Sequence, residues 1–543
     1  MISKIYLFLL IISGFAPFSQ AQVSEQWIAR YHPSLSQNDY GNDMLLDELG
    51  NIYVIGITKN QISGDNNWII LKYSSSGNML WEITYNGLYS NGSDEAISIA
   101  LSNTENCIYV TGFVRPLNAG PRSIITKKIT FSGEQIWSKT YTSNDDIPFK
   151  IAVSESGNIF VAGRTNTSGL LIKYNQNGDL QWIKDYNFNN LLNNGFVDMC
   201  IDPEENIYAV SSSGTNPIVS DFTATKFNSS GNLIWEKIYN GPANDNDEPC
   251  SIGIDNNGNI YAAGKSRGIG TEYDFTVVSY DNSGEMRWES RIASLLDDEA
   301  SDLFIDNQSR IYVTGYISAP QVSADFLTVK YSQEGNIFWQ RQFNNPYNYW
   351  DIAQSITVDN QYNVYITGKS GRPPLQLADY TTLKYNLSGE LVWSKNYNGL
   401  SEGVNEDIPR KIAVDNNNNV YVTGHSMGVH AYDVCTIKYS QQLVGINPVS
   451  SEIPNGFSLY QNYPNPFNPV TKIRFELPEG AARLVNLTVF DALGRKIETP
   501  VSQYLLPGTY EIDWNAYNYT SGIYFYKLTS KDFTEIKKMV LVK

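Results

Sequence analysis

Residues 255–292 read DNNGNIYAAGKSRGIGTEYDFTVVSYDNSGEMRWESRI, and versions of this stretch recur along most of the chain. It holds short runs rich in β-branched and aromatic residues, separated by turns built on Gly258 and Gly284. Gly and Asn accept the positive φ that tight hairpin turns require. The stretch therefore predicts short antiparallel strands joined by hairpins, in an all-β chain.

An aromatic residue marks the same strand in every copy of the repeat. The copies carry it at Tyr53, Tyr109, Phe160, Tyr208, Tyr261, Tyr312, Tyr365 and Tyr421. The mean period is about 53 residues, which is long enough for the four short strands of one β-propeller blade. We therefore expect each repeat to form one blade.

A Gly-x-x-x-Trp step follows in the same units, and we expect its Trp to fill the gap between adjacent blades. It recurs at Gly77/Trp81, Gly133/Trp137, Gly178/Trp182, Gly231/Trp235, Gly284/Trp288, Gly335/Trp339 and Gly389/Trp393. The last unit stops after Tyr439, and the strand it lacks matches Trp27–Tyr31 near the N-terminus. The pattern predicts an eight-bladed propeller closed by this N-terminal strand, which leaves no open edge between blades. Seven blades is the alternative if the short unit at 160–182 is degenerate.

The chain divides into four predicted segments. Residues 1–21 are typical of a signal peptide, with Lys4, an apolar run from Ile5 to Ile12 and a small-residue cleavage site at Ala21. The propeller is expected over 22–440, a linker over 441–456 and a second domain over 457–543. The apolar run is too short to cross a bilayer, so we expect no transmembrane segment.

The second domain carries an ordered set of motifs. They include YPNPFNP at 463–469, VFDALGR at 489–495, SGIYF at 521–525 and a basic final strand at 537–543. Its signature residues are Asn465, Pro466, Phe467, Asn468, Pro469, Asp491, Gly494, Arg495, Gly522, Tyr524, Lys537 and Lys538. The segment resembles the C-terminal sorting domain (type A) of the bacterial type IX secretion system, and the repeats resemble the bacterial β-propeller repeat often found before it.

This resemblance implies an Ig-like β-sandwich that is recognised by an outer-membrane translocon and a sortase. It also implies export through the periplasm of a Gram-negative bacterium, followed by release or attachment to surface lipopolysaccharide. The residues agree on the fold, since alternating strands such as 473–477 lie between Pro- and Gly-rich turns.

Composition and charge restrict the partners. The formal net charge is −17, so the chain would be repelled by phosphate backbones, and we expect no nucleic-acid partner. We expect a monomer.

Catalytic motifs are scarce. The three histidines, His32, His425 and His430, form no metal-binding motif, and the last two are expected to be exposed loop residues. The four cysteines are spaced far apart and lie in predicted strands, so buried, reduced thiols are favoured over disulfides. Catalysis is therefore not the favoured function, and no cofactor is expected.

One acidic position recurs at a fixed offset, eight residues before the end of each innermost strand. It is occupied by Asp39, Asp94, Asp146, Asn194, Asp247, Asp298, Asp351 and Asp407. In a closed propeller these residues are expected to form a ring near one mouth of the channel, and carboxylates there would suit Ca²⁺. The alternative is that each carboxylate caps the loop of its own blade through backbone N–H groups.

Variable loops provide the other candidate site. They lie at 59–66, 114–122, 266–272, 318–324 and 370–378, after the aromatic strands. Loops on a rigid scaffold often carry binding residues, so a glycan or protein ligand is expected there. The sequence thus favours an exported, non-catalytic binding module, with an extracellular polysaccharide hydrolase or lyase as the alternative.

Overall fold

The chain folds into two compact units, Ser24–Ser440 and a unit made chiefly of Gln441–Lys543. The computed structural model describes residues 23–33, 37–60, 64–87, 92–116, 120–166, 168–187, 195–216, 219–319, 322–373, 377–400, 406–441, 446–450, 453–480, 483–505, 507–517, 519–530 and 533–543. The predicted signal peptide, residues 1–21, lies outside them. Every regular element in these ranges is a β-strand.

Within the described residues, the first unit contains eight four-stranded antiparallel sheets. The first four are β2 (Tyr40–Leu46), β3 (Ile52–Lys59), β4 (Asn66–Tyr73) and β5 (Met79–Tyr85); β6 (Glu95–Ser102), β7 (Cys107–Val114), β8 (Ser123–Thr130) and β9 (Gln135–Tyr141); β10 (Ile147–Val153), β11 (Ile159–Arg164), β12 (Gly169–Tyr174) and β13 (Leu180–Tyr186); β14 (Phe196–Ile201), β15 (Ile207–Asn216), β16 (Val219–Phe227) and β17 (Leu233–Tyr239).

The other four sheets repeat this order. They are β18 (Asp247–Ile254), β19 (Ile260–Arg267), β20 (Tyr273–Tyr280) and β21 (Met286–Ile292); β22 (Glu299–Ile305), β23 (Ile311–Ala319), β24 (Val322–Tyr331) and β25 (Ile337–Phe343); β26 (Asp351–Val358), β27 (Val364–Arg372), β28 (Leu377–Tyr385) and β29 (Leu391–Tyr397); and β30 (Ile408–Val414), β31 (Val420–Met427) and β32 (Tyr432–Gln441) with β1 (Val23–Tyr31).

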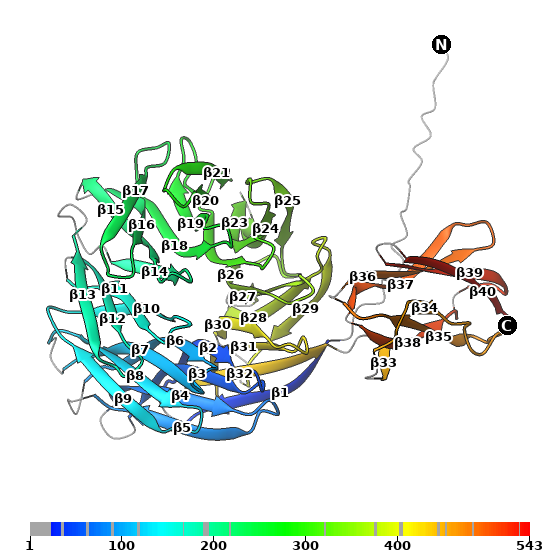
Figure 1. Ribbon diagram of the computed structural model, residues 1–543, viewed down its shortest axis with the longest axis horizontal. Helices are drawn as coiled ribbons and strands as arrows, with labels where there is room; N and C mark the ends of the chain where they lie inside the picture. Colours follow the sequence, from blue (N-terminus) through cyan, green and yellow to red (C-terminus); the bar gives the residue numbers. More distant parts are fainter. Residues whose placement is uncertain are drawn as a thin grey trace, which may run out of the picture. The chain divides into compact units, whose positions relative to one another are not determined.

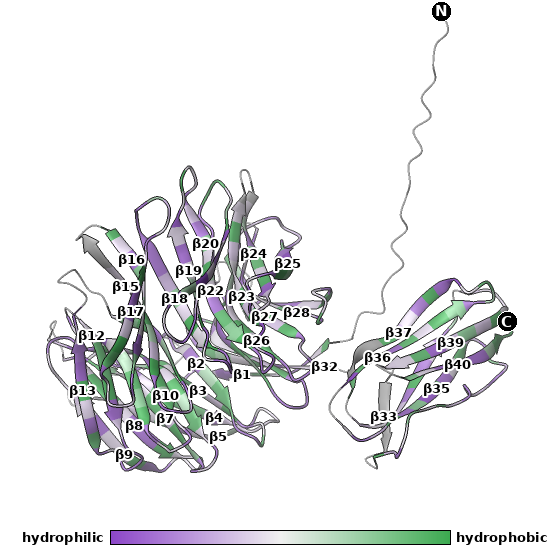
Figure 2. Cartoon of the chain, turned by 45° about the horizontal axis from the view of Figure 1, so that its top comes forward, coloured by the Kyte–Doolittle hydropathy of each residue, from purple (hydrophilic) through white to green (hydrophobic). Residues whose placement is uncertain are grey.

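The eight sheets are arranged as a closed ring, as in a β-propeller (Figure 1). The first strand of each sheet contacts the first strand of the next, and β2 contacts both β6 and β30. These innermost strands therefore surround the central space. The second and third strands of each sheet are almost entirely buried, and their apolar side chains, green in Figure 2, form cores between neighbouring sheets.

The turn between the first and second strands explains the repeated Asp, Asn and Tyr. Oδ1 of Asp255 accepts hydrogen bonds from the backbone N–H groups of Asn257 (2.8 Å) and Asn259 (2.9 Å). Its Oδ2 accepts from Nδ2 of Asn259 and from the hydroxyl of Tyr261, each at 2.9 Å. One buried carboxylate thus fixes both the turn and the strand after it. The same contacts recur around Asp47, Asp202, Asp359 and Asp415.

The tryptophans lock adjacent sheets together. Nε1 of Trp339 donates to the carbonyl of Leu387 in the next sheet at 3.1 Å. The indole also lies against Gly389, where an added Cβ would be 2.7 Å from the ring and where φ is +77°. Only glycine fits this turn, which explains why most of these Trp residues are matched by a glycine in the next repeat. This confirms that the Trp fills the gap between adjacent sheets.

The N-terminal strand closes the ring. β1 lies at the edge of the last sheet, beside β32 (Figure 1). Trp27 Nε1 donates to the Ser75 carbonyl of the first sheet at 3.2 Å. Arg30 donates to Asp433 at 2.8 Å and to the Tyr397 hydroxyl at 2.7 Å. The predicted completion of the last unit by the N-terminal strand is confirmed.

The second unit contains two four-stranded sheets in its described residues. One comprises β33 (Ile446–Ser450), β38 (Gly508–Asn515), β35 (Val470–Leu477) and β34 (Ser458–Leu459); the other comprises β37 (Lys496–Leu505), β36 (Arg483–Asp491), β39 (Gly522–Ser530) and β40 (Phe533–Leu541). They share an apolar core that includes Phe475, Trp514 and Tyr526. The segment 441–456, predicted as a linker, contains β33, which pairs with β38; the first strand of this unit therefore precedes the predicted boundary at 457.

No helix long and apolar enough to span a membrane occurs in the described part of the chain. All four cysteines lie in strands as free thiols, Cys107 and Cys435 buried and Cys200 and Cys250 partly so.

Candidate functional site

The predicted acidic ring consists of buried loop caps where the structure describes it. The seven aspartates are at most 1% exposed, and Asn194 lies outside the described residues. Asp407 accepts the backbone N–H groups of Gly399 (2.7 Å) and Met427 (3.0 Å). The Asp407 carboxylate thus joins the segment entering its sheet to the end of the second strand, and Asp94 and Asp298 do the same. Related contacts form at Asp39, Asp94, Asp146, Asp247, Asp298 and Asp351.

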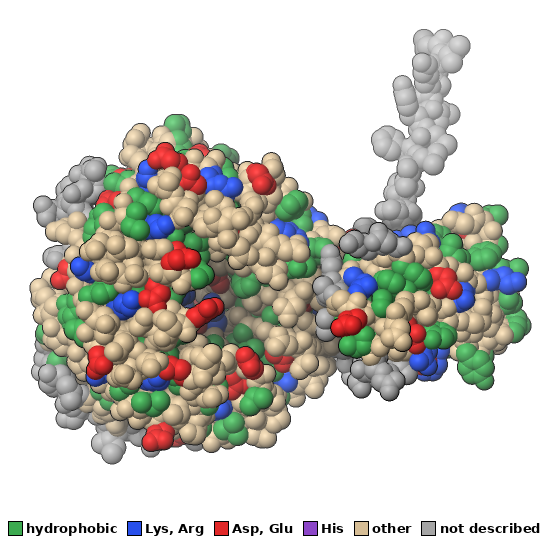
Figure 3. Space-filling view, viewed as in Figure 1, with side chains coloured by type: hydrophobic (Ala, Val, Ile, Leu, Met, Phe, Trp, Pro, Cys, Tyr) green, Lys and Arg blue, Asp and Glu red, His purple; other side chains and the backbone are tan. Residues whose placement is uncertain are grey.

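Burial changes the acidity of these groups. It raises the pKa of Asp39 and of Asp94 to about 6, against the hydrogen bonds that favour the charged form. No group of three or more His, Cys, Asp or Glu side chains is arranged to hold a metal ion among the described residues. Asp and Glu side chains are instead scattered over the face seen in Figure 3.

The histidine prediction is wrong for His425. This residue lies on β31, not in a loop, and its ring is 6% exposed. It packs edge-on against Tyr40 and Tyr432, with ring centroids 4.8 and 5.3 Å away. Burial lowers its pKa to about 3, so the imidazole is neutral and belongs to the core.

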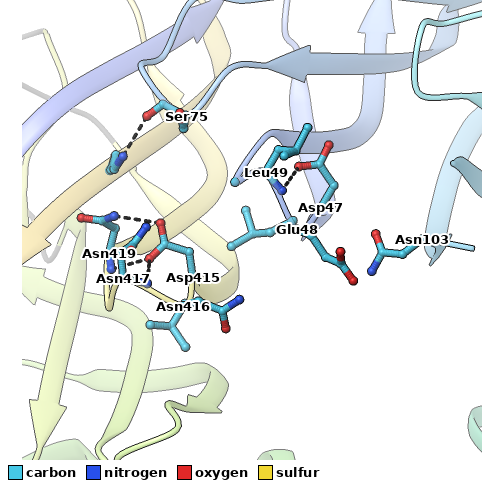
Figure 4. A pocket seen from close by; sticks show the side chains of 13 residues that line it. Asp47, Glu48, Leu49, Ser75, Asn103, Asp415, Asn416, Asn417 and Asn419 are labelled. Carbon is cyan, nitrogen blue, oxygen red and sulfur yellow. Dashed lines mark hydrogen bonds between the residues drawn. The ribbon is translucent and has the colours of Figure 1, made fainter. Parts of the chain in front are cut away.

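A groove opens elsewhere, between the first and the last sheets of the ring (Figure 4). Its volume is about 340 Å³. Two hairpin turns form its walls, Asp47–Gly50 between β2 and β3 and Asp415–Asn419 between β30 and β31. Ser75, Asn103 and Lys438 complete the lining, with Leu46 and Val414. We call this the hairpin groove.

Some polar side chains of the hairpin groove form hydrogen bonds within the protein, and others do not. Asp47 and Asp415 are engaged by their own turns. The exposed side chains of Glu48, Asn103 and Asn417 form no hydrogen bond with any other described residue. In Figure 4 the Glu48 carboxylate points toward the Asn103 carboxamide. These groups are free to bind a ligand.

Two small turn residues, Ser75 and Gly50, leave the groove open. Ser229 is equally small at the equivalent position of another junction, but there the Glu205 carboxylate, which stands in place of Gly50, accepts from the Ser154 hydroxyl at 2.8 Å and from Lys173 Nζ at 2.7 Å. At two other junctions the side chain equivalent to Ser75 reaches the preceding sheet. Phe131 packs on Tyr53 with centroids 5.4 Å apart, and Gln333 donates to Asp255 at 2.9 Å. Ser75 offers only its carbonyl, which accepts from Lys438 Nζ at 2.8 Å and from Trp27. The side chain that would cover Asp415 is therefore missing.

The electrostatics of the groove are weakly acidic. Its lining carries three carboxylates, Asp47, Glu48 and Asp415, against the single ammonium of Lys438. Burial lowers the pKa of Lys438, and Asp415 opposes that shift. The groove therefore disfavours anions.

The sequence did not point to this groove. The variable loops follow the second strand of each sheet, whereas the groove lies at the turns between the first and second strands. The available signal was Ser75, a short side chain at a position where only Ser229 is equally small and the other repeats carry Phe131, Gln176, Asn282, Gln333 and Leu387.

The sorting-motif residues lie at two places in the second unit. Phe467 and Tyr524 are in the core, and the Phe467 and Trp514 ring centroids are 5.6 Å apart. The remaining described motif residues lie nearer the surface: Asn465 accepts the Val540 N–H at 2.9 Å, and Asp491 forms a turn by accepting the Arg495 N–H at 2.9 Å and its Nε at 2.6 Å. The others are Pro466, Asn468, Pro469, Gly494, Gly522, Lys537 and Lys538.

Comparison with protein families assigns both parts of the chain. Residues 461–543 match the secretion system C-terminal sorting domain. Residues 136–170 and 403–428 match a β-propeller repeat family. The chain thus combines β-propeller repeats with a type IX sorting domain, which directs it to the cell surface or exterior and implies contact with the secretion machinery.

Individual relatives are distant. An uncharacterized WD repeat-containing protein of Acanthamoeba polyphaga mimivirus, L264, is 29% identical over 119 residues, which cover 18% of this chain and 8% of that protein. The structure of Sqt1 from Chaetomium thermophilum has a TM-score of 0.48 at 8% identity, over 77% of this chain and 98% of that one. The WD40 domain of SCAP from fission yeast has a TM-score of 0.43 at 11% identity, over 77% and 97%. Neither score bears on function.

Proposed function

We propose that this secreted β-propeller protein is a non-catalytic binding module whose ligand occupies the hairpin groove. The observation that carries the proposal is the groove itself. Polar side chains without a described partner gather there, at a junction where Ser75 replaces the larger residues found at five of the six equivalent positions. At the described acidic-ring positions, by contrast, the carboxylates cap loops.

The proposal takes the eight sheets as eight blades and the two sheets of the second unit as an Ig-like sandwich. On this view the sandwich is read by a translocon and a sortase, and the ring is delivered as a monomer, then released or attached to lipopolysaccharide. Ring closure by β1 supports the eight-bladed view, because β1 gives the last sheet the fourth strand that the other seven sheets also have.

The groove gives more support to binding than to hydrolysis. A glycosidase needs two carboxyl groups that are free to exchange protons or attack. Two of the three carboxylates in the groove already accept hydrogen bonds within their own turns, and only Glu48 is exposed and unengaged in the described structure. A second catalytic acid therefore has no candidate in the groove.

Retention on immobilised extracellular polymers tests the function. The chain from residue 22 onward is applied to columns of neutral polysaccharide, anionic polysaccharide and denatured protein, and soluble products are assayed in parallel. Retention without release of reducing ends or unsaturated sugars is expected. Release of such products would favour the hydrolase or lyase alternative, and no retention on any column would refute the binding function.

A further inference from the structure

The polar side chains of the hairpin groove indicate what kind of ligand it binds. Two of its free polar groups are the exposed carboxamides of Asn103 and Asn417. Asn416 is also exposed there; its Oδ1 accepts from Asn360 Nδ2 at 3.4 Å, which leaves its Nδ2 to donate to a ligand. A carboxamide presents a donor and an acceptor side by side, which matches the adjacent hydroxyls of a sugar. A site that binds a cation would be expected to have more free carboxylates than the single one of Glu48.

Two further features match the same ligand. Leu49 is 82% exposed at the lip of the groove, where it can cover the apolar face of a sugar ring. The lining carries more carboxylates than ammonium groups, which disfavours uronates, sulfates and phosphates. The volume of about 340 Å³ is at the low end of small-molecule sites, so a short saccharide segment fits.

We infer that the hairpin groove binds a neutral saccharide, held by the carboxamides of Asn103, Asn416 and Asn417 and the carboxylate of Glu48. This inference rests on the proposed binding function and names its ligand class and its place. The saccharide lies across the two hairpin turns, with Ser75 beneath it. Its hydroxyls donate to Glu48 and exchange hydrogen bonds with the three amides.

Two substitutions at Ser75 are expected to close the groove with side chains that other repeats carry at the equivalent position. Ser75→Phe installs the residue found at the equivalent Phe131, which lies beside Lys72 there as it would beside Lys438 here. Ser75→Gln installs the equivalent of Gln333. Since neighbouring junctions accommodate these residues, both variants are expected to melt near the wild-type temperature.

Calorimetry on the full mature chain tests the inference with neutral oligosaccharides of glucose, galactose, mannose and xylose, and with a uronate oligosaccharide as the anionic probe. We expect a neutral oligosaccharide to bind the wild type and to bind Ser75→Phe at least about tenfold more weakly. Asn417→Ala should weaken binding about fivefold, the effect of one hydrogen bond. Asn257→Ala is the matched control, because this residue holds the same turn position in a sheet outside the groove.

Each other outcome identifies what failed. Equal saccharide binding by the wild type and Ser75→Phe would overturn the groove as the site while leaving the binding function intact. Equal or tighter binding of the uronate would overturn the neutral ligand class. Retention on the protein column without saccharide binding would overturn the saccharide and keep the function, whereas no retention anywhere would remove the function itself.

Discussion

Most innermost strands have a buried aspartate at the start of the strand, here called the entering end, and another aspartate just after it, called the leaving end; the two ends differ in what surrounds the aspartate. At the entering end, Asp351 is buried and holds Asn345 through hydrogen bonds of 2.8 and 2.7 Å. At the leaving end, Asp359 is also buried, but the residue beyond it, Asn360, is exposed at the tip of the turn. The fold fixes the aspartates and leaves the tips free to vary. Residues that repeat therefore report the architecture, and residues that break the repeat are the candidates for binding.

The largest effect is expected from Asp359→Ala at the leaving end. This change leaves four donors without their acceptor: the N–H groups of Gln361 and Asn363, the Asn363 amide and the Tyr365 hydroxyl. It also removes the charge that faces Lys384. We expect a loss of about 3–5 kcal/mol in the free energy of unfolding, measured in urea at neutral pH. The exposed Asn360→Ala should change it by less than about 0.5 kcal/mol, and equal losses in the two variants would contradict the comparison.

The next largest effect is a pH dependence of the free energy of unfolding, caused by Asp94 at the entering end. Burial raises the pKa of Asp94 to about 6, above its ordinary value of 3.8. The folded state therefore holds the proton more tightly than the unfolded chain. The stability that this group contributes is fully present below pH 4 and is lost as the pH rises through 6, by up to about 3 kcal/mol.

Asp94→Asn isolates this group because the amide does not titrate. The melting temperature of the variant relative to wild type should be several degrees more favourable at pH 7.5 than at pH 4.5. A difference that is independent of pH, or that has the opposite sign, would show that the Asp94 pKa is not raised in the folded state.

A smaller loss is expected from Asp351→Ala. The N–H of Asn345 loses its acceptor, and its amide loses one of two, since it also donates to the Gly371 carbonyl at 3.0 Å; we expect the free energy of unfolding to fall by about 2 kcal/mol. Asp351→Asn keeps one acceptor oxygen and should recover about half of that loss. If Asp351→Ala lowers the free energy of unfolding more than Asp359→Ala does, the aspartate at the leaving end is not the more stabilising of the two.

Much of the ring was predictable because the repeat is enforced at every junction. The Gly389 position tolerates only glycine beside Trp339, so its spacing is visible in the sequence, as is the need for Trp27 to complete the last sheet. His425 was misjudged because a core position on β31 looks like a loop when its neighbours are small and polar. The groove depends on the small side chain of Ser75. A small residue leaves a groove only where two turns that are distant in the sequence face each other, and the sequence does not show which turns do so.

The smallest effect concerns calcium. Ca²⁺ takes six to eight oxygen ligands, whereas the described aspartates of the acidic ring accept loop N–H groups and gather in no group of three or more. We therefore expect the melting temperature to change by less than about 1 °C when chelator or Ca²⁺ is added, since little binding energy is coupled to folding. A Ca²⁺-dependent rise that disappears in the Asp247→Asn, Asp298→Asn double variant would instead show that the ring holds a cation. In that case the entering ends of the strands, and not only the hairpin groove, would carry a ligand site.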